Sequence, residues 1–332
     1  MKPNTPSIAA LILVLIAPWP CRAEAIVLNP EKPIVIKDAK AGFDFIQVDT
    51  LARRLLANHT RNGTFDVFDL DSGALIKLCP VGAAQGVAVD EKGGKYYVGV
   101  SKEKKLVTID AKTLEKTGEV TLPGPADDAL FNPTNGLVYV CHDDGKDLWV
   151  IDPSAGKIVA SVEIGEAPEV LVYDAGADRI YQNIKSSSVV SVVNPATNKV
   201  EHDWAVSPAT GPHGLALDGA THRLFVAGAN GRLVVLDSSN GKLVADIGLP
   251  PGVDQIAIDP ELKLIYCPSS KQGTLTVYRE TEAGVESAGE VAIAKGCHSV
   301  AVDPKTHAVW IVYADTKQAF LQRLVPTLHL KP

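Results

Sequence analysis

A repeat of about 41 to 44 residues runs through most of the chain. The unit is clearest where a short apolar segment ends on an acid, as in GVAVD at 86–90 and SVAVD at 299–303. Five further copies occupy 45–49, 128–132, 170–174, 214–218 and 255–259. Seven copies of so short a unit restrict the chain to architectures that stack modules or arrange them in a ring.

Each repeat has the pattern of four short strands. In the third copy, a second apolar segment begins at Leu137, a third ends at Asp152, and a fourth occupies 158–165. Short β-branched segments between Gly, Pro, Asn and Asp residues are typical of strands and turns. Four antiparallel strands per repeat form a propeller blade of the WD40-like kind. The sequence therefore predicts an all-β, seven-bladed β-propeller.

The two ends of the repeat array complement each other. The seventh unit, from about residue 295, ends after its third segment near Val325, while residues 26–37 precede the first unit and contain the spare strand PIVIK. We expect this N-terminal strand to complete the last blade and close the ring, which also protects the sheet edges. A solenoid of the same repeats is the alternative, but it needs capping units that the sequence does not contain.

Residues 1–23 have the pattern of a signal peptide. Lys2 precedes an apolar segment from Ile8 to Ala17, and Ala23 is the small residue expected at a cleavage point. We expect one propeller domain over 24–332, a periplasmic or secreted location and no membrane span after cleavage. A retained anchor and a lipid-modified Cys21 are the alternatives.

The charge of the chain excludes one class of partner. Loss of residues 1–23 leaves 30 basic and 39 acidic residues, a formal net charge of −9, with no basic cluster. Such a protein binds polyanions poorly, so we expect no nucleic-acid partner. The expected partners are a small molecule or a periplasmic protein, and the expected state is a monomer.

Four cysteines follow the predicted cleavage point: Cys79, Cys141, Cys267 and Cys297. An even number in an oxidising compartment permits disulfides. Cys267 and Cys297 fall in neighbouring repeats and are the favoured pair. The alternative is that the cysteines are buried free thiols, which pack as small apolar residues.

Alignment of the repeats predicts a ring of polar side chains. The residues just before the seven first strands are Asp44, Gln85, Asp127, Glu169, His213, Asp254 and His298. First strands are innermost in a propeller and run in the same direction, so these side chains should surround one mouth of the central channel. His59 and His142 end two second strands and should lie near the same mouth, farther from the axis. All nine are candidates for ligand binding.

Several carboxylates around one channel repel each other unless they are solvated, protonated or neutralised by a cation. A divalent metal is one solution, with Asp44, Asp127, Glu169, His213, Asp254 and His298 as candidate ligands. Oxygen ligands alone suit Ca²⁺ or Mg²⁺, whereas the two histidines shift the preference to Zn²⁺, Mn²⁺ or Fe²⁺. The alternatives are polar residues facing water in the channel, or recognition of an organic cation.

The strand and turn pattern resembles the YVTN-repeat β-propeller family of exported bacterial and archaeal proteins. The closest stretches are RLLANHTRNGTFDVFDLDSGALIKLCPVG at 54–82 and LVYVCHDDGKDLWVIDPSAGKIVASVEIG at 137–165, and the similarity covers about 39–325. The resemblance implies the fold but not an activity, because the matching positions build blades.

Three functions remain open. The first is a periplasmic binding or scaffold protein that uses the channel mouth. The second is a metal-dependent hydrolase of lactones or esters, similar to lactonases of the gluconolactonase type, in which a metal polarises a carbonyl and a His or carboxylate is the base. The third is an accessory subunit of a periplasmic redox enzyme. The sequence contains no complete catalytic motif, phosphate loop or haem-attachment motif, so whether the chain is an enzyme stays open.

Overall fold

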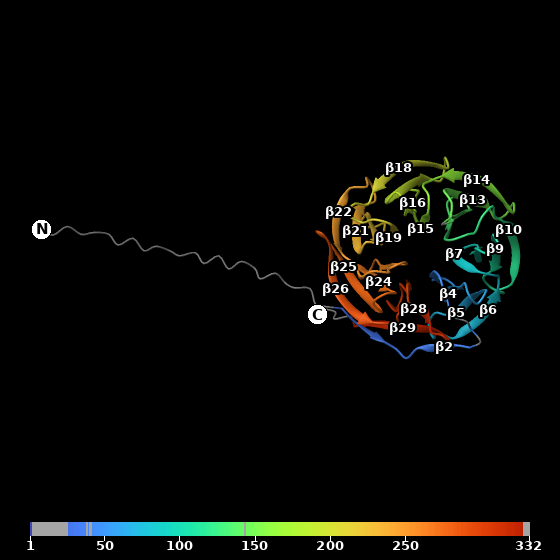
Figure 1. Cartoon of the computed structure of the whole chain (residues 1–332), viewed down its shortest axis with the longest axis horizontal. Coiled ribbons are helices and arrows are strands. Elements are labelled where there is room, and N and C mark those ends of the chain that lie inside the picture. Colours follow the sequence, from blue (N-terminus) through green and yellow to red (C-terminus); the bar gives the residue numbers. More distant parts are fainter. Residues whose placement is uncertain (2–25, 38, 40–41, 143, 328–332) are drawn as a thin grey trace.

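Seven antiparallel sheets, six of four strands and one of five, are arranged in a ring around a central axis (Figure 1). This computed structural model describes Met1 and residues 26–37, 39, 42–142 and 144–327. The predicted signal peptide lies outside the described residues. The predicted all-β, seven-bladed propeller is confirmed, and the described chain forms no helix.

Each blade is an antiparallel sheet whose first strand is nearest the axis. Blade 1 contains β3 (Ile46–Asp49), β4 (Arg54–His59), β5 (Thr64–Asp69) and β6 (Leu75–Pro80). Blade 2 contains β7 (Ala84–Asp90), β8 (Lys95–Val100), β9 (Lys105–Asp110) and β10 (Lys116–Thr121). Blade 3 contains β11 (Ala129–Asn132), β12 (Leu137–Val140), β13 (Asp147–Asp152) and β14 (Lys157–Glu163).

The remaining blades follow the same order. Blade 4 contains β15 (Pro168–Asp174), β16 (Arg179–Ile184), β17 (Val189–Asn194) and β18 (Lys199–Ala205). Blade 5 contains β19 (Pro212–Asp218), β20 (Arg223–Gly228), β21 (Arg232–Asp237) and β22 (Leu243–Gly248). Blade 6 contains β23 (Ala257–Asp259), β24 (Leu264–Ser269), β25 (Thr274–Thr281) and β26 (Gly284–Ala292). Blade 7 contains β27 (Ser299–Val302), β28 (Val309–Ala314) and β29 (Ala319–Thr327).

The N-terminal segment completes blade 7, as the repeat pattern predicts. Two short strands, β1 (Val27–Pro30) and β2 (Ile34–Ile36), both pair antiparallel with β29. The first and last parts of the described chain are therefore joined by backbone hydrogen bonds in one sheet, and the ring has no open edge at its closure.

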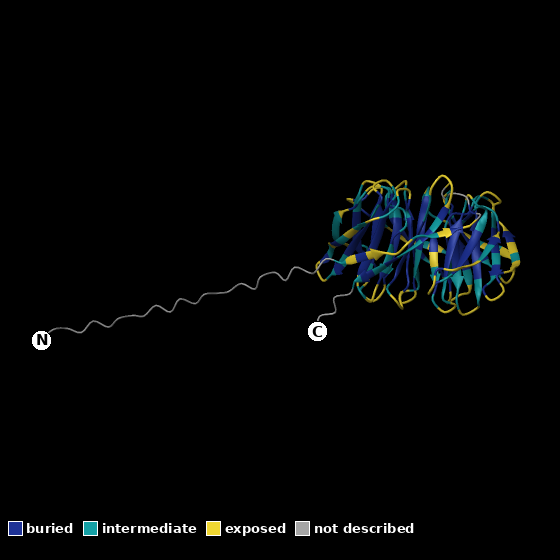
Figure 2. Ribbon diagram, turned by 90° about the horizontal axis from the view of Figure 1, so that it is seen from below, coloured by how far each residue is buried: buried dark blue, intermediate teal, exposed yellow. Residues whose placement is uncertain are grey.

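The core is divided among the seven interfaces between blades. Each interface holds its own cluster of buried apolar side chains, contributed by the two facing sheets. The buried residues run through the middle of the ring in Figure 2, with exposed residues at the turns and on the outer strands. The inner strands are covered on both faces by neighbouring blades, which explains why they lack a simple apolar and polar alternation.

The favoured Cys267–Cys297 pairing is wrong. Cys79, Cys141, Cys267 and Cys297 are all buried free thiols. Cys267 packs between blades 5 and 6, whereas Cys297 packs between blades 6 and 7, so the sheet of blade 6 separates them. Burial raises the pKa of the Cys297 thiol to about 12, which makes its reactive thiolate scarce.

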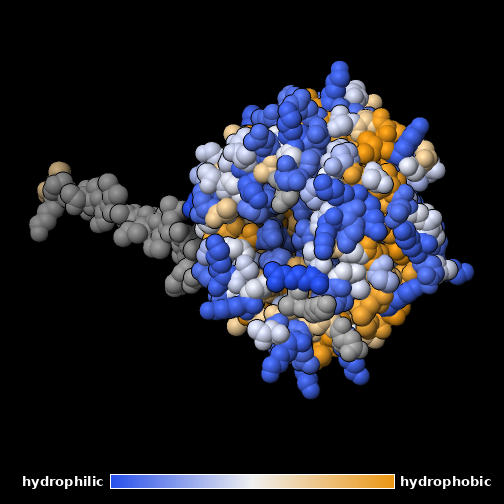
Figure 3. Space-filling model, turned by 45° about the vertical axis from the view of Figure 1, so that its right-hand side comes forward, coloured by the Kyte–Doolittle hydropathy of each residue, from blue (hydrophilic) through white to orange (hydrophobic). Residues whose placement is uncertain are grey.

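The outer surface carries few large apolar side chains. In the described chain, the exposed ones on strands are Val27, Val35, Leu75, Ile76, Val159 and Leu243, all on outer strands. Figure 3 shows hydrophilic residues over most of the face in view, with apolar residues showing between them. The structure contains no helix of the length and apolarity needed to cross a membrane, among the residues it describes.

Candidate functional site

Three predicted mouth residues from consecutive blades converge on one point. Glu169 on β15, His213 on β19 and Asp254 before β23 each present one potential metal-ligating atom, and these atoms all lie within 4.8 Å of one another. Glu169 is buried, while His213 and Asp254 are partly exposed. We call these three residues the mouth cluster.

His213 is held in the orientation of a metal ligand. Its Nδ1 lies 2.9 Å from the backbone oxygen of Gly211, and because a carbonyl oxygen only accepts, Nδ1 carries the proton and donates. In the neutral ring this leaves the lone pair on Nε2, which lies 3.8 Å from Oε1 of Glu169. A backbone carbonyl that fixes the histidine tautomer in this way is a common feature of metal sites.

A glycine allows blades 5 and 6 to approach each other closely at the mouth. At Gly214, an added Cβ would lie 2.6 Å from the backbone oxygen of Asp254. Side-chain amide hydrogen bonds from Asn183 hold the same segment through the backbone oxygens of His213 and Gly214, at 2.8 and 3.1 Å. These contacts place blades 4, 5 and 6 close together at the mouth.

Glu169 has a cationic partner that the sequence analysis missed. The ammonium group of Lys185 donates a hydrogen bond to Oε1 of Glu169. Burial raises the pKa of Glu169 above its ordinary value, while Lys185 and His213 oppose that rise. Lys185 directly follows Ile184, which ends the second strand of blade 4. The ends of second strands lie near the mouth, and this position was the one sequence signal that could have placed Lys185 there.

His298 and Asp254 form a second pair at the mouth, with Nδ1 of His298 3.3 Å from Oδ2 of Asp254. Burial raises the pKa of Asp254, but the hydrogen bond and charge of His298 outweigh it and hold that pKa below its ordinary value. Burial lowers the pKa of His298, and Asp254 with Asp44 raises it above the ordinary value. A cavity of about 260 Å³ adjoins this pair and is lined also by His213, Ser270 and Lys271.

Asp44 lies next to this pair. Burial and the charge of Asp254 raise the pKa of Asp44 to about 8, although His298 opposes the shift. Its carboxyl group is therefore largely protonated at neutral pH. Together with the Glu169–Lys185 and Asp254–His298 pairs, this removes much of the repulsion expected among the carboxylates.

The other predicted site residues do not join the mouth cluster. Gln85 and Asp127 come from blades 2 and 3, outside the arc of blades that supplies the converging residues. His59 is fully buried in blade 1, where Nδ1 lies 2.7 Å from Asp66 and the ring stacks on Phe43. The role of these residues in binding stays a prediction.

His142 occupies a separate pocket between blades 2 and 3. Its ring stacks on Trp149 with centroids 4.2 Å apart, and Nδ1 lies 3.0 Å from Asp144. The residue is 7% exposed. The structure thus gives His142 a packing environment of its own, apart from the mouth cluster.

The channel is closed just below the mouth. Phe45 of blade 1 is buried in the apolar cluster of blades 4 and 5. Because those blades lie across the channel from blade 1, the phenyl side chain of Phe45 extends across the central axis. The side-chain amide of Gln255 donates to the backbone oxygen of Ile46 at 2.8 Å, and its oxygen accepts from the backbone N–H groups of Ile46 and Val300. These two side chains form a floor that the repeat alignment did not predict.

The mouth therefore forms a polar site above the floor of Phe45 and Gln255. One imidazole nitrogen and two carboxylates are a donor set suited to divalent transition metals. The adjoining cavity leaves room for a ligand beside such an ion. His298 and Asp44 could hold or transfer protons at its edge.

Comparison with known proteins supports the fold and a distant relationship. No protein-family model matches the chain. The uncharacterized protein YncE of Salmonella typhimurium is 24% identical over 149 residues, which cover 43% of this chain and 42% of that protein. YncE of Salmonella typhi is 21% identical over 250 residues, which cover 70% of each protein. The chain thus spans less than half of the first relative's length.

Two solved structures share the architecture. Kuenenia stuttgartiensis hydrazine synthase superposes with a TM-score of 0.74 at 13% identity, covering 86% of this chain and 96% of that one. A chain of a mitotic checkpoint complex superposes with a TM-score of 0.76 at 12% identity, covering 96% and 98%. At these identities the likeness concerns the fold alone. The chain is a seven-bladed propeller with distant similarity to YncE proteins.

Proposed function

We propose that this chain is an exported, periplasmic propeller of the YVTN-repeat type that binds a divalent metal ion at its channel mouth and holds a small ligand or partner there. The convergence of Glu169, His213 and Asp254, with Nε2 of His213 available to coordinate, carries the proposal. The strand and turn pattern of the sequence supports the repeat type.

The donor set favours Zn²⁺, Mn²⁺ or Fe²⁺ over Ca²⁺, since an imidazole nitrogen takes part. Lys185 opposes a cation electrostatically, because its ammonium group donates to Oε1 of Glu169. A metal ion at this site would therefore compete with Lys185 for Glu169.

Calorimetric titration of metal-free protein with zinc chloride tests the proposal. We expect one ion per chain and a loss of affinity of at least about tenfold in His213→Gln, because the nitrogen ligand is removed. His202→Gln is the matched control, since His202 is exposed on the outer strand β18. Absence of stoichiometric binding, or equal affinity in His213→Gln, would contradict the proposal.

Removal of Lys185 gives a test of opposite sign. Lys185→Met takes away the positive charge beside Glu169 and should strengthen zinc binding, whereas loss of a ligand weakens it. Weaker binding in Lys185→Met would show that the ammonium group supports the site rather than competing with the ion.

Metal-dependent hydrolysis is the second candidate, favoured by Asp44. Burial and the charge of Asp254 raise the pKa of Asp44 to about 8 in the metal-free protein, and a protonated carboxyl group beside the mouth cluster can donate a proton to a leaving group. A panel of lactones and esters with zinc-loaded protein tests this, with Asp44→Asn expected to lower kcat. Absence of turnover in the wild-type protein would remove hydrolysis while leaving metal binding in place.

A further inference from the structure

A second cavity lies on the other side of the floor, inside the ring. It has a volume of about 440 Å³ and is lined by inner-strand residues of all seven blades. Its lining starts with Phe45 and Gln255 and continues to Thr50 and Pro304, and it includes none of the seven mouth residues. The cavity is therefore separate from the mouth cluster and opens toward the opposite face.

Apolar side chains dominate the walls. Most of the lining positions are valine, leucine, isoleucine, alanine or phenylalanine, including Phe131 and Val172. Polar atoms of the inner strands also contribute to the lining, and a concave cavity of this size is in the range that small organic ligands occupy. Gln255 is fully engaged by backbone groups and offers little to a ligand.

Asp128 is the one ionisable side chain among the described residues that line the cavity. It stands at the end next to the floor, where Oδ1 accepts from the N–H of Ala129 at 2.8 Å and Oδ2 accepts from the N–H of Leu171 at 3.3 Å. Each carboxylate oxygen has two lone pairs, so both keep acceptor capacity.

A carboxylate in an apolar cavity is costly unless a cation or a proton neutralises it. The lining supplies no lysine, arginine or histidine within the described chain. The cavity thus contains one carboxyl group that no side chain of the lining neutralises. Burial raises the pKa of Asp128 to about 7, so the group is mostly ionised at pH 8.

We propose that this cavity binds a small organic ammonium ion, with its charged head at Asp128 and its apolar body along the channel walls. The carboxylate of Asp128 would bind the ammonium group through a charged hydrogen bond, and the apolar side chains would bury the hydrocarbon portion of the ligand. No residue of the mouth cluster lines this cavity, so its occupancy does not require a metal.

Calorimetric titrations at about pH 8 with n-hexylammonium, n-hexanol and hexanoate test the proposal. We expect n-hexylammonium to bind about tenfold more tightly than n-hexanol, and hexanoate to bind most weakly, since one charged hydrogen bond in a desolvated site contributes about that factor. Equal affinity for the ammonium ion and the alcohol, or preference for the carboxylate, would overturn the proposal.

Two variants locate the binding. Asp128→Asn keeps an acceptor for Ala129 but removes the charge, and it should lose about tenfold in n-hexylammonium affinity while leaving n-hexanol unchanged. Glu166→Gln, which removes an exposed charge elsewhere, is the control. If Asp128→Asn does not fold, Val172→Phe should narrow the cavity and weaken binding of both ligands. Unchanged n-hexylammonium binding in either folded variant would place the ligand elsewhere and overturn the proposal.

Discussion

The orientation of His213 depends on one backbone carbonyl. The hydrogen bond to Gly211 directs Nε2 toward Glu169 and Asp254. A histidine on a solvated turn has no such constraint, and its coordination would cost more conformational entropy. The ability of His213 to coordinate a metal therefore depends on the local backbone geometry as much as on the residue type.

Gly214 supplies the space that this geometry needs. Gly214→Ala should lower the free energy of unfolding by about 1–3 kcal/mol and weaken metal binding, because the new methyl group would meet the backbone of Asp254. Urea denaturation and zinc titration measure both effects. Gly248→Ala is the control, since an added Cβ there has open space. Equal behaviour of the two variants would contradict the close approach.

Glu280 makes stability depend on pH at the contact between blades 5 and 6. Burial raises its pKa, and the charge of Asp218 adds to the rise. The stabilisation from the protonated group is complete below the ordinary glutamate pKa and is lost as the pH rises through the higher native value.

Glu280→Gln removes this titration. The melting temperature of the wild-type protein, relative to that of the variant, should fall as the pH rises above the ordinary glutamate pKa. Glu282→Gln, at an exposed position, should show no such trend. A difference between wild type and Glu280→Gln that stays constant with pH would contradict the shifted pKa.

At the scale of elements, the closing strands of blade 7 do more than add a fourth strand. Pro30 pairs with Leu324 but Ile34 pairs with Leu321, so the register shifts by one residue between β1 and β2. Since side chains alternate across a strand, a one-residue shift moves the next side chains to the other face.

The shift explains where the closing strands pack. Leu28 on β1 is buried between blades 6 and 7, whereas Ile36 on β2 is buried between blades 7 and 1. The N-terminal segment therefore contributes to both interfaces of the last blade. The sequence predicts a closing strand in this segment but shows no sign of the register shift.

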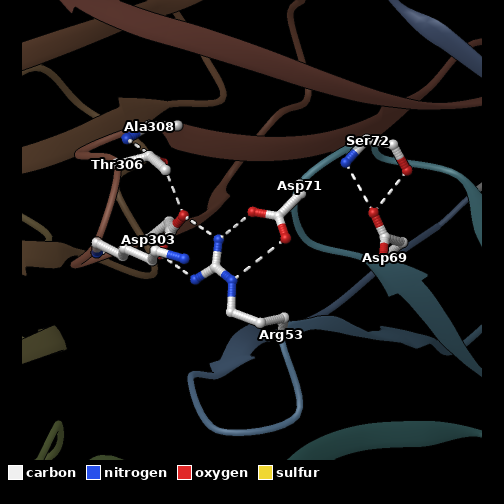
Figure 4. A network of polar contacts seen from close by, with 8 residues as sticks. Arg53, Asp69, Asp71, Ser72, Asp303, Thr306 and Ala308 are labelled. Carbon is white, nitrogen blue, oxygen red and sulfur yellow. Dashed lines mark hydrogen bonds and ion pairs between the residues drawn. The ribbon is translucent and has the colours of Figure 1, made fainter.

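Arg53 forms a second link across the ring closure (Figure 4). The residue lies before β4 in blade 1, and its guanidinium donates to both carboxylate oxygens of Asp303 in blade 7 at 2.7 Å and also contacts Asp71. The side chain of Asp303 is 1% exposed, whereas that of Asp71 is 58% exposed. Asp303 thus depends on Arg53 for compensation of a buried charge.

Arg53→Met should lower the free energy of unfolding by about 3 kcal/mol, because it leaves Asp303 buried without its cation. Asp71→Asn should cost less than about 1 kcal/mol, since that ion pair is solvated. Urea unfolding of both variants makes the comparison. A cost for Asp71→Asn equal to that of Arg53→Met would contradict the importance of the buried pair.

At the scale of the whole molecule, the repeats predict the blade number, the ring closure and which residues stand at the same height around the axis. They do not predict contacts that cross the axis, because side-chain reach is not encoded in the repeat. The floor of Phe45 and Gln255 is of this kind. The pairing of Lys185 with Glu169 lies within blade 4, but it too depends on how far a long side chain extends. The cysteine pairing failed for a related reason, since adjacency in the repeats ignores the intervening sheet.

The most direct test of the metal site is a crystal structure of the protein soaked with zinc, with anomalous diffraction measured on both sides of the zinc absorption edge. We predict one strong anomalous peak within coordination distance of Glu169, His213 and Asp254, at a zinc–nitrogen distance of about 2.0–2.1 Å. A map without a peak there, or with zinc bound only at other residues, would contradict the account.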